Sequence, residues 1–301
     1  MSAIVVVGSL AYDSIATPKG SVNRVLGGSS NYFSLAASHF SQVHVVGVVG
    51  EDYNAADLQI LRDRSVDVEG IVRAPGKTFH WKGEYHADMN DAITLATDLN
   101  VFAQFNPQIP EKYRSCEYLF LANIDPVLQL RVLNQMQSPR LVCCDTMNFW
   151  INGKLSDLKK VMTRTDVLLI NEGESMQLSG ATNAIAAAEI IAKMGPKAVV
   201  IKRGEYGFVL CYQNELFILP AFPVAQVIDP TGAGDSFAGG FIGYLAREGK
   251  GLDFASLKQA CVYGCLLASF TVEGFGIEGQ KNLDWRKVEE RMNAYRKITS
   301  F

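Results

Sequence analysis

Residues 229–243 read Asp-Pro-Thr-Gly-Ala-Gly-Asp-Ser-Phe-Ala-Gly-Gly-Phe-Ile-Gly, a glycine-rich turn that opens directly into an apolar helix. The first turn of a helix leaves backbone N–H groups without intrahelical partners and carries the positive end of the helix dipole, so it attracts anions. Gly232 and Gly234 have no Cβ and let the backbone approach an anion closely. The stretch therefore predicts a phosphate-binding turn.

Asp235 is the unexpected residue of this turn, because a carboxylate repels a bound phosphate unless it has another task. One such task is to take a proton from the group that attacks the phosphate. The alternative is a helix cap, which stabilises a helix by roughly 0.5–2 kcal/mol. A cap requires neither the preceding Gly-Ala-Gly nor the glycines at 239, 240 and 243, each of which costs up to about 1 kcal/mol in a helix. These glycines indicate close packing against another element.

The turn resembles the second signature of the ribokinase-like, PfkB-type carbohydrate and nucleoside kinases. The resemblance implies that Asp235 is the catalytic base. It also implies that the amides of Gly232, Ala233 and Gly234 form an anion hole for the transferring phosphoryl group. Asp229 matches the upstream acid of that family, which lies near the nucleotide phosphates and their magnesium.

A second stretch, Gly27-Gly28-Ser29-Ser30-Asn31, is similar to the first signature of the same family, in which glycines and an Asn line the substrate site. It follows a strand-like run at 4–7 and Asp13, in the order that the family shows. Asp13 corresponds to the residue that holds two substrate hydroxyls, a task that suits an acceptor-only carboxylate. The resemblance thus predicts an acceptor site made by Asp13, Gly27, Gly28 and Asn31.

A third stretch, Asn171-Glu172-Gly173-Glu174, follows the apolar run 167–170 and matches the Asn-x-x-Glu motif of the family. Mg²⁺ keeps much of its water and is usually held by one or two carboxylates plus substrate phosphates. The resemblance implies a magnesium site at Asn171, Glu174 and Asp229. The alternative is an Asn cap with acids in the first helical turn.

The resemblance places the nucleotide contacts in the C-terminal half of the chain. They are expected at Lys202, Gly204, Gly207, Thr231, Gly274, Phe275 and Gly276. In the family, the loop that here spans 271–276 borders the adenine and often a monovalent cation, so K⁺ is an expected ligand beside ATP and Mg²⁺. A glycine-rich hairpin at 202–207 and a helix C-cap at 271–276 would give the same residues.

Short apolar runs separated by helical stretches predict an α/β fold with a buried parallel sheet. The expected strands are 4–7, 43–48, 118–121, 141–144, 167–170 and 198–201. Ligands in such sheets bind beyond the carboxyl ends of the strands. We expect a single ribokinase-like catalytic domain over residues 1–301, with three α/β/α layers, a mostly parallel central sheet and a small β-sheet lid.

The lid is expected to be discontinuous, at about 13–26 and 76–100. A strand at 79–86 would place His80, Lys82, Glu84 and His86 on one face and Trp81, Gly83 and Tyr85 on the other. Four interpretations stay open: metal binding by His80, Glu84 and His86, contact of Trp81 or His80 with a sugar or base, packing in a homodimer, and an exposed polar face.

Composition limits the alternatives. The chain has 301 residues, 48% of them apolar, and a net charge of −3 without a basic run, which argues against a nucleic-acid partner. Six cysteines without Cys-x-x-Cys spacing indicate reduced thiols and a cytoplasmic location. The apolar runs are shorter than the roughly 20 residues of a membrane helix, so no membrane partner is expected.

Together these features predict an ATP-dependent kinase that phosphorylates a hydroxyl of a small polyol such as a sugar. A nucleoside kinase of the adenosine or inosine type is the alternative, which the aromatic lid residues favour. An inactive sugar-sensing protein on the same scaffold is a third reading, against which the intact motifs argue.

Overall fold

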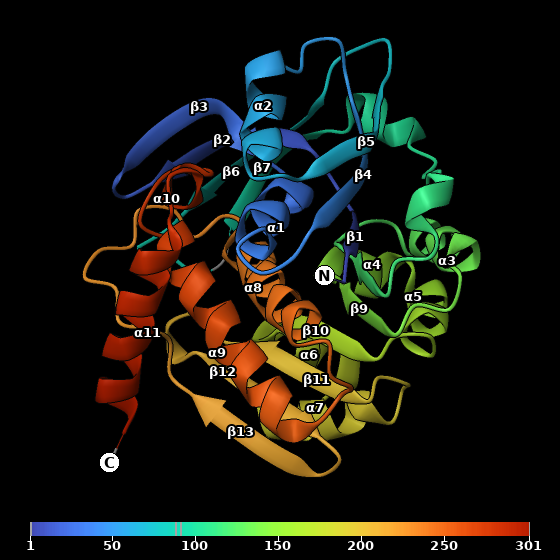
Figure 1. The fold of residues 1–301 in the computed structure, drawn as a ribbon. Coiled ribbons are helices and arrows are strands. Elements are labelled where there is room, and N and C mark those ends of the chain that lie inside the picture. The colour runs from blue at the N-terminus through green and yellow to red at the C-terminus, as the bar shows by residue number, and fades with distance from the viewer. Residues whose placement is uncertain (1, 88, 91, 301) are drawn as a thin grey trace.

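The computed structural model describes residues 2–87, 89–90 and 92–300, and in this part of the chain nine strands form one large sheet between two layers of helices (Figure 1). The strand order is β13-β12-β11-β10-β9-β8-β1-β4-β5. These strands are β1 (Ile4–Val7), β4 (Val43–Val49), β5 (Asp67–Arg73), β8 (Tyr118–Leu121), β9 (Leu141–Asp145), β10 (Val167–Asn171), β11 (Ala198–Lys202), β12 (Phe208–Tyr212) and β13 (Glu215–Leu219).

The sheet is parallel from β5 to β11, and β12 and β13 add an antiparallel edge. Its central strands are buried on both faces, which explains why they read as continuous apolar runs. Along β1, Ile4 and Val6 pack into one hydrophobic core and Val5 and Val7 into the other. The alternation of side chains thus creates two cores, one on each face of the sheet.

Helices α1, α8, α9 and α11 cover one core, and α3, α5 and α7 contribute to the other. The helices are α1 (Ser29–Ala37), α2 (Ala55–Asp63), α3 (Pro126–Gln135), α4 (Asn148–Gly153), α5 (Leu155–Met162), α6 (Glu172–Ser179), α7 (Ala184–Ala192), α8 (Ala233–Glu248), α9 (Phe254–Thr271), α10 (Glu278–Lys281) and α11 (Trp285–Thr299), with 3-10 turns η1 (Asn100–Gln104), η2 (Glu111–Tyr113) and η3 (Gly204–Tyr206). No helix in the described ranges is both long and apolar enough to cross a bilayer.

A second, four-stranded sheet has the order β3-β2-β6-β7 and is the predicted lid. It consists of β2 (Ala11–Thr17), β3 (Gly20–Gly27), β6 (Phe79–Tyr85) and β7 (Ala92–Asp98). Figure 1 shows this sheet beside α2 and α10, outside the layers of the large sheet. Asp88 and Asp91 of the predicted lid segment lie outside the described residues, as do the two terminal residues of the predicted domain.

Helix α8 packs on α1 and α9 through its glycines. A Cβ on Gly239 would lie 2.4 Å from the Phe33 carbonyl oxygen, and one on Gly240 would lie 2.7 Å from the Tyr263 carbonyl oxygen. Such distances leave no room for a side chain. The close packing that the glycine run indicated is confirmed, and it holds the first turn of α8 against the N-terminal half of the chain.

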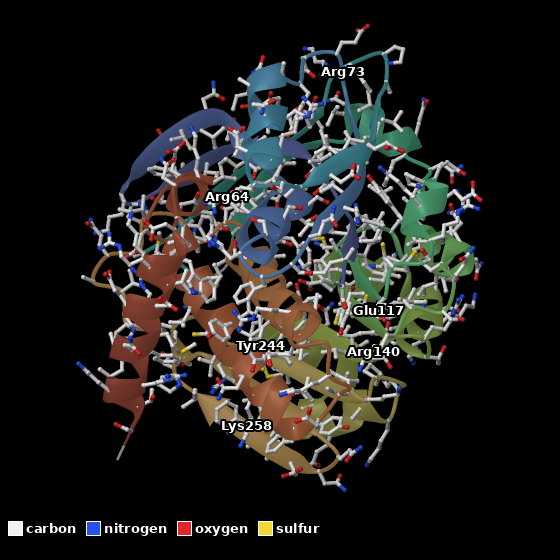
Figure 2. All side chains as sticks on the ribbon, in the orientation of Figure 1. Arg64, Arg73, Glu117, Arg140, Tyr244 and Lys258 are labelled. Carbon is white, nitrogen blue, oxygen red and sulfur yellow. The ribbon has the colours of Figure 1, made fainter. Side chains whose placement is uncertain are left out.

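The C-terminal loop before α11 is tied to α2 by one arginine. Arg64 follows α2, and its guanidinium donates hydrogen bonds to the carbonyl oxygens of Gln280 at 3.0 Å and Leu283 at 2.6 Å. Figure 2 shows Arg64 at this junction between α2 and α10. The contact fixes the segment 280–283 beside the end of α2.

Gly239→Ala tests the contact between α8 and α1. The added methyl group meets a backbone carbonyl that cannot move alone, so the free energy of unfolding should fall by roughly 1–3 kcal/mol. Gly153→Ala is the matched control, because a Cβ at Gly153 would meet nothing within 4 Å. Urea denaturation measures both variants. Equal stability of the two alanine variants would contradict the proposed packing.

Candidate active site

The first turn of α8 faces the lid and adopts a backbone that requires glycine. Gly232 is the N-cap residue with φ of 77°, and a Cβ there would lie 2.4 Å from the ring of Tyr32 on α1. Both the positive φ and the neighbouring ring exclude a side chain. The turn is therefore shaped by backbone alone, as expected for an anion-binding segment.

The N–H groups of the turn differ in whether they have a hydrogen-bond acceptor within the described part of the protein. Ala233 donates its N–H to the Pro230 carbonyl oxygen at 3.2 Å. Among the described residues, no acceptor is found for the N–H groups of Gly232, Gly234 and Asp235. The Ala233 amide thus closes the turn, and the amides on either side of it are open to an anion, while the predicted hole of Gly232, Ala233 and Gly234 stays a prediction.

Asp235 has the environment of a base rather than of a cap. No N–H or O–H of the described residues donates to its carboxylate, and α8 has no side-chain cap. Burial raises the pKa of Asp235 to about 7, and the charge of Asp145 adds to this, whereas Lys202 opposes it. A carboxyl with a pKa close to neutrality can accept and release a proton under ordinary conditions.

Lys202 places a positive charge beside the same turn. Its Nζ lies 2.9 Å from Asp145 Oδ2 and 3.0 Å from the point where a Cβ of Gly234 would stand. Burial alone would lower the pKa of Lys202, but Asp145 and Glu174 raise it above its ordinary value. The ammonium therefore stays charged next to the open amides. Its position explains why the predicted nucleotide contact falls on the end of β11.

Asn171 and Glu174 form a reciprocal capping box at the start of α6. Asn171 Oδ1 accepts from the Glu174 N–H at 2.7 Å, and Glu174 Oε2 accepts from the Asn171 N–H at 3.0 Å. The capping alternative is therefore observed. The charge of Glu174 also acts on Lys202, so the carboxylate faces the turn as well. A role for both residues in holding magnesium stays a prediction.

Asp229 lies in the segment before α8, and backbone N–H groups hold its carboxylate. It is fully buried, and its carboxylate accepts from the N–H groups of Thr231 at 2.9 Å and Gly276 at 3.0 Å. Its charge raises the pKa of Asp13. No cluster of three His, Cys, Asp or Glu side chains able to hold a metal occurs within the described residues. The Thr231 and Gly276 N–H groups hold the Asp229 carboxylate, and a role for Asp229 with Asn171 and Glu174 in holding magnesium stays a prediction.

Asp13 on β2 is enclosed by the two predicted glycines. The Gly28 N–H donates to its carboxylate, and a Cβ on Gly27 would lie 1.9 Å from Asp13 Oδ2. Burial raises the pKa of Asp13 to about 8, with further contributions from Asp229 and Asp235. Glycines at 27 and 28 thus leave room for a buried carboxylate.

Asn31 has hydrogen-bond partners within the protein, and its contact with a substrate stays a prediction. Its side-chain amide donates to the Gly27 carbonyl oxygen at 2.6 Å and lies 3.4 Å from Tyr53 Oη. The residue is completely buried in this network and contributes no contact to Asp13. The next residue, Tyr32, faces the carboxylates instead. One step along a helix turns a side chain by about 100°, and the sequence gives no sign of which of two neighbouring polar residues faces a ligand.

Trp81 lies on the same lid face as Asp13. The two residues are partners in the parallel register of β2 and β6, so their side chains point to the same side. His80 points to the opposite side and contacts Ser14 Oγ at 2.9 Å. The metal interpretation of His80, Glu84 and His86 finds no support in the described residues. A homodimer through the lid stays a prediction.

The predicted nucleotide contacts lie at the end of β11, in the hairpin between β11 and β12, and in the segments on either side of the helix pair α8 and α9. Gly204 and Gly207 have positive φ in the hairpin between β11 and β12, as the alternative interpretation expected. Thr231 Oγ1 donates to Tyr85 Oη of the lid at 3.1 Å. The segment of Gly274, Phe275 and Gly276 packs near β3 and its turn. Contacts of these residues with a nucleotide, and of this loop with K⁺, stay predictions.

The site combines a helix start with unpaired amides, a neighbouring ammonium and a carboxyl poised to take a proton. This is the arrangement of a phosphoryl-transfer enzyme, in which positioned charges stabilise the transferring group. The chain belongs to the pfkB family of carbohydrate kinases, whose model matches residues 1–281. It is a phosphotransferase of that family, and the expected kinase is confirmed.

Individual relatives and solved structures that resemble this chain are kinases. A cytidine kinase of Thermococcus kodakarensis is 31% identical over 254 residues, which cover 81% of this chain and 88% of that protein. The crystal structure of Methanocaldococcus jannaschii nucleoside kinase, an archaeal member of the ribokinase family, has a TM-score of 0.77 at 24% identity and covers 98% of this chain and 99% of that one. Aminoimidazole riboside kinase from Salmonella enterica, complexed with aminoimidazole riboside and an ATP analog, gives 0.73 at 18% identity over 96% and 99%. The ribokinase-like fold is thereby confirmed.

Asp13→Asn tests the charge buried in the acceptor site. The pKa of Asp13 is about 8 in the folded protein against 3.8 for an ordinary Asp, so the folded state keeps a proton that the unfolded chain releases. Stability therefore falls as pH rises from about 4 to 8, and the neutral amide removes this loss. The thermal midpoint of the variant should exceed that of the wild type by several degrees at pH 8.5 and by less at pH 5. The exposed Asp63→Asn variant is the control, and an equal midpoint at both pH values would contradict the buried charge.

Proposed function

We propose that this chain is an ATP-dependent nucleoside kinase in which Asp235 is the general base. The observation that carries the proposal is the position of Asp235 between two groups of residues. On one side lie the open amides of the α8 turn and the Lys202 ammonium, and on the other lies Asp13 in its glycine enclosure. A phosphate bound on the first side and an acceptor hydroxyl on the second would meet at Asp235.

The mechanism follows from these positions. Asp13 accepts hydrogen bonds from acceptor hydroxyls and orients them, and Asp235 takes the proton of the attacking hydroxyl as its oxygen bonds to the γ-phosphorus of ATP. The bond to the leaving oxygen of ADP breaks in line. The N–H groups of Gly232 and Gly234 and the ammonium of Lys202 stabilise the charge on the equatorial oxygens.

Magnesium fits the nucleotide side of this site. The carboxylates of Glu174 and Asp145 both act on Lys202 and so lie on the side of the open amides, and one or two carboxylates with water are the usual protein share of Mg²⁺ coordination. When bound with ATP there, the ion would neutralise charge on the β- and γ-phosphate oxygens.

Two observations support a nucleoside as the acceptor. The similarity to the cytidine kinase extends over most of both chains. On the lid, Trp81 offers a flat aromatic surface on the face that carries Asp13, and such a ring can stack on a base. The sugar kinase that the sequence favoured remains the second candidate, since Asp13 serves any polyol and the family model is that of carbohydrate kinases.

A screen of ADP release at fixed Mg·ATP decides between these acceptors. The panel contains cytidine, uridine, adenosine, inosine and guanosine together with ribose, fructose and myo-inositol. We expect turnover with at least one nucleoside at kcat/KM well above that of any sugar. Turnover with sugars alone would favour a sugar kinase. The absence of turnover with all of these compounds would favour an inactive sensing protein.

Asp235→Asn tests the general base. The amide cannot accept the proton, so kcat should fall by roughly 10²–10⁴ while the dissociation constant of ATP changes little. Asp63→Asn, on the exposed surface of α2, is the control for loss of one negative charge. Near-wild-type kcat in the purified Asp235 variant would overturn the assignment.

Asp145→Asn tests how the pKa of the base is set. The Asp145 charge raises the pKa of Asp235, and Asp145 also holds Lys202, whose charge lowers it. Removing the Asp145 charge should therefore lower the pKa of Asp235 and move the acid limb of the kcat/KM profile to lower pH. Lys202→Met should move the same limb to higher pH. Shifts of equal sign in the two variants would contradict this electrostatic account.

A further inference from the structure

The residue after Asn31 has a buried hydroxyl group that the mechanism above does not use. Tyr32 is 1% exposed, and its Oη finds no hydrogen-bond partner among the described residues. Its ring fills the space beside Gly232 in the anion-binding turn. Buried hydroxyl groups in native proteins are nearly always paired, so an unpaired one needs an explanation.

The surroundings of this hydroxyl group are acidic. The charges of Asp13, Asp229 and Asp235 all act on it, and the phenol of Tyr85 from the lid is a further neighbour. Burial, assisted by these charges, raises the pKa of Tyr32 well above its usual value. The group therefore keeps its proton, and with its ring against Gly232 it is a hydrogen-bond donor beside the turn that carries Asp235.

An acceptor with several hydroxyl groups needs a donor as well as acceptors. Each hydroxyl group donates one hydrogen bond and has lone pairs that accept others, whereas ionised Asp13 and Asp235 only accept. The amide of Asn31, which could have donated, is engaged with Gly27 and Tyr53. Tyr32 is left as a neutral donor on which the charges of three carboxylates act.

We propose that Tyr32 determines acceptor specificity by donating a hydrogen bond from Oη to a hydroxyl oxygen of the bound acceptor, next to the carboxylates of Asp13 and Asp235. The ligand that fits has vicinal hydroxyl groups, as a ribose ring has. This inference rests on the proposed function, because it assigns a residue to the acceptor site of the same reaction.

A purely structural role makes a different prediction. If Tyr32 only supports the turn at Gly232, its ring matters and its hydroxyl group does not. Tyr32→Phe keeps the ring and removes the oxygen, so it separates the two roles. Because the oxygen is unpaired in the ligand-free protein, its removal should leave the thermal midpoint unchanged or raise it.

The experiment compares steady-state kinetics of Tyr32→Phe and the wild type with the best acceptor from the screen. We expect the KM of the acceptor to rise about tenfold, as for the loss of one hydrogen bond between uncharged groups, with the KM of ATP within twofold. Tyr118→Phe is the matched control, since it also removes a buried and unpaired phenolic oxygen, from β8. Its acceptor KM should not change.

Deoxy acceptors identify the hydroxyl group involved. The wild type should have a higher KM for the analogue that lacks this hydroxyl group. In Tyr32→Phe, this difference between the acceptor and the analogue should shrink about tenfold, while the differences for analogues modified at other positions should stay.

An acceptor KM of Tyr32→Phe within twofold of wild type, or a parallel rise in the KM of ATP, would overturn the inference and leave the proposed kinase activity intact. A wild-type chain that phosphorylates no acceptor would contradict the proposed function itself, and with it the acceptor site. Turnover with a sugar alone would reject the nucleoside but still test Tyr32 with that sugar.

Discussion

Three carboxylates that approach one buried space are the constraint on which the site depends. Asp13 comes from the lid, Asp229 from the segment before α8, and Asp235 from the first turn of that helix. Like charges in a poorly solvated space repel strongly, and each group also loses its hydration. Loss of hydration raises the pKa values of all three. Repulsion by another carboxylate adds to this for Asp13 and Asp235.

Backbone N–H groups, instead of bulky side chains, compensate the charges of Asp13 and Asp229. The Gly28 N–H donates to Asp13, and the N–H groups of Thr231 and Gly276 donate to Asp229. Glycine is suited to such positions because it lets the backbone come close. Asp235 receives no such donor among the described residues and has only the nearby Lys202 charge to oppose the increase of its pKa. Of the three acids it is the one left to exchange a proton.

The lid completes this environment by contacts with the segments that carry the acids. Thr17 Oγ1 donates to the Ile228 carbonyl oxygen at 2.9 Å, and Thr231 contacts Tyr85 at 3.1 Å. Both contacts join the small sheet to the residues on either side of Asp229. In the proposed reaction, a lid held in this way would limit water, which competes with the acceptor hydroxyl for the phosphoryl group.

Much of the fold could be predicted, because burial on both faces of a parallel sheet leaves a strong apolar signal. The six expected strands are present with their ends shifted by at most one residue, and the glycines of α8 correctly indicated close packing. The resemblance also pointed to Asp13 and Asp235, whose roles stay predictions. It did not indicate the details that a single bond or helix angle decides. The Ala233 amide donates to the Pro230 carbonyl oxygen, the Asn31 amide donates to Gly27, and the charges of the acids act on Tyr32. Side-chain direction and the choice of partner depend on packing that no short motif records.

The central claim is that the free protein holds protons on these carboxylates which an acceptor displaces. Hydroxyl groups that donate to Asp13 favour its ionised form, so binding should lower its pKa from about 8. Calorimetric titration of the acceptor at pH 7, in buffers with different ionisation enthalpies, measures the protons exchanged. The account predicts net proton release in the wild type and markedly less in Asp13→Asn. A binding enthalpy of the wild type that does not depend on the buffer would contradict it.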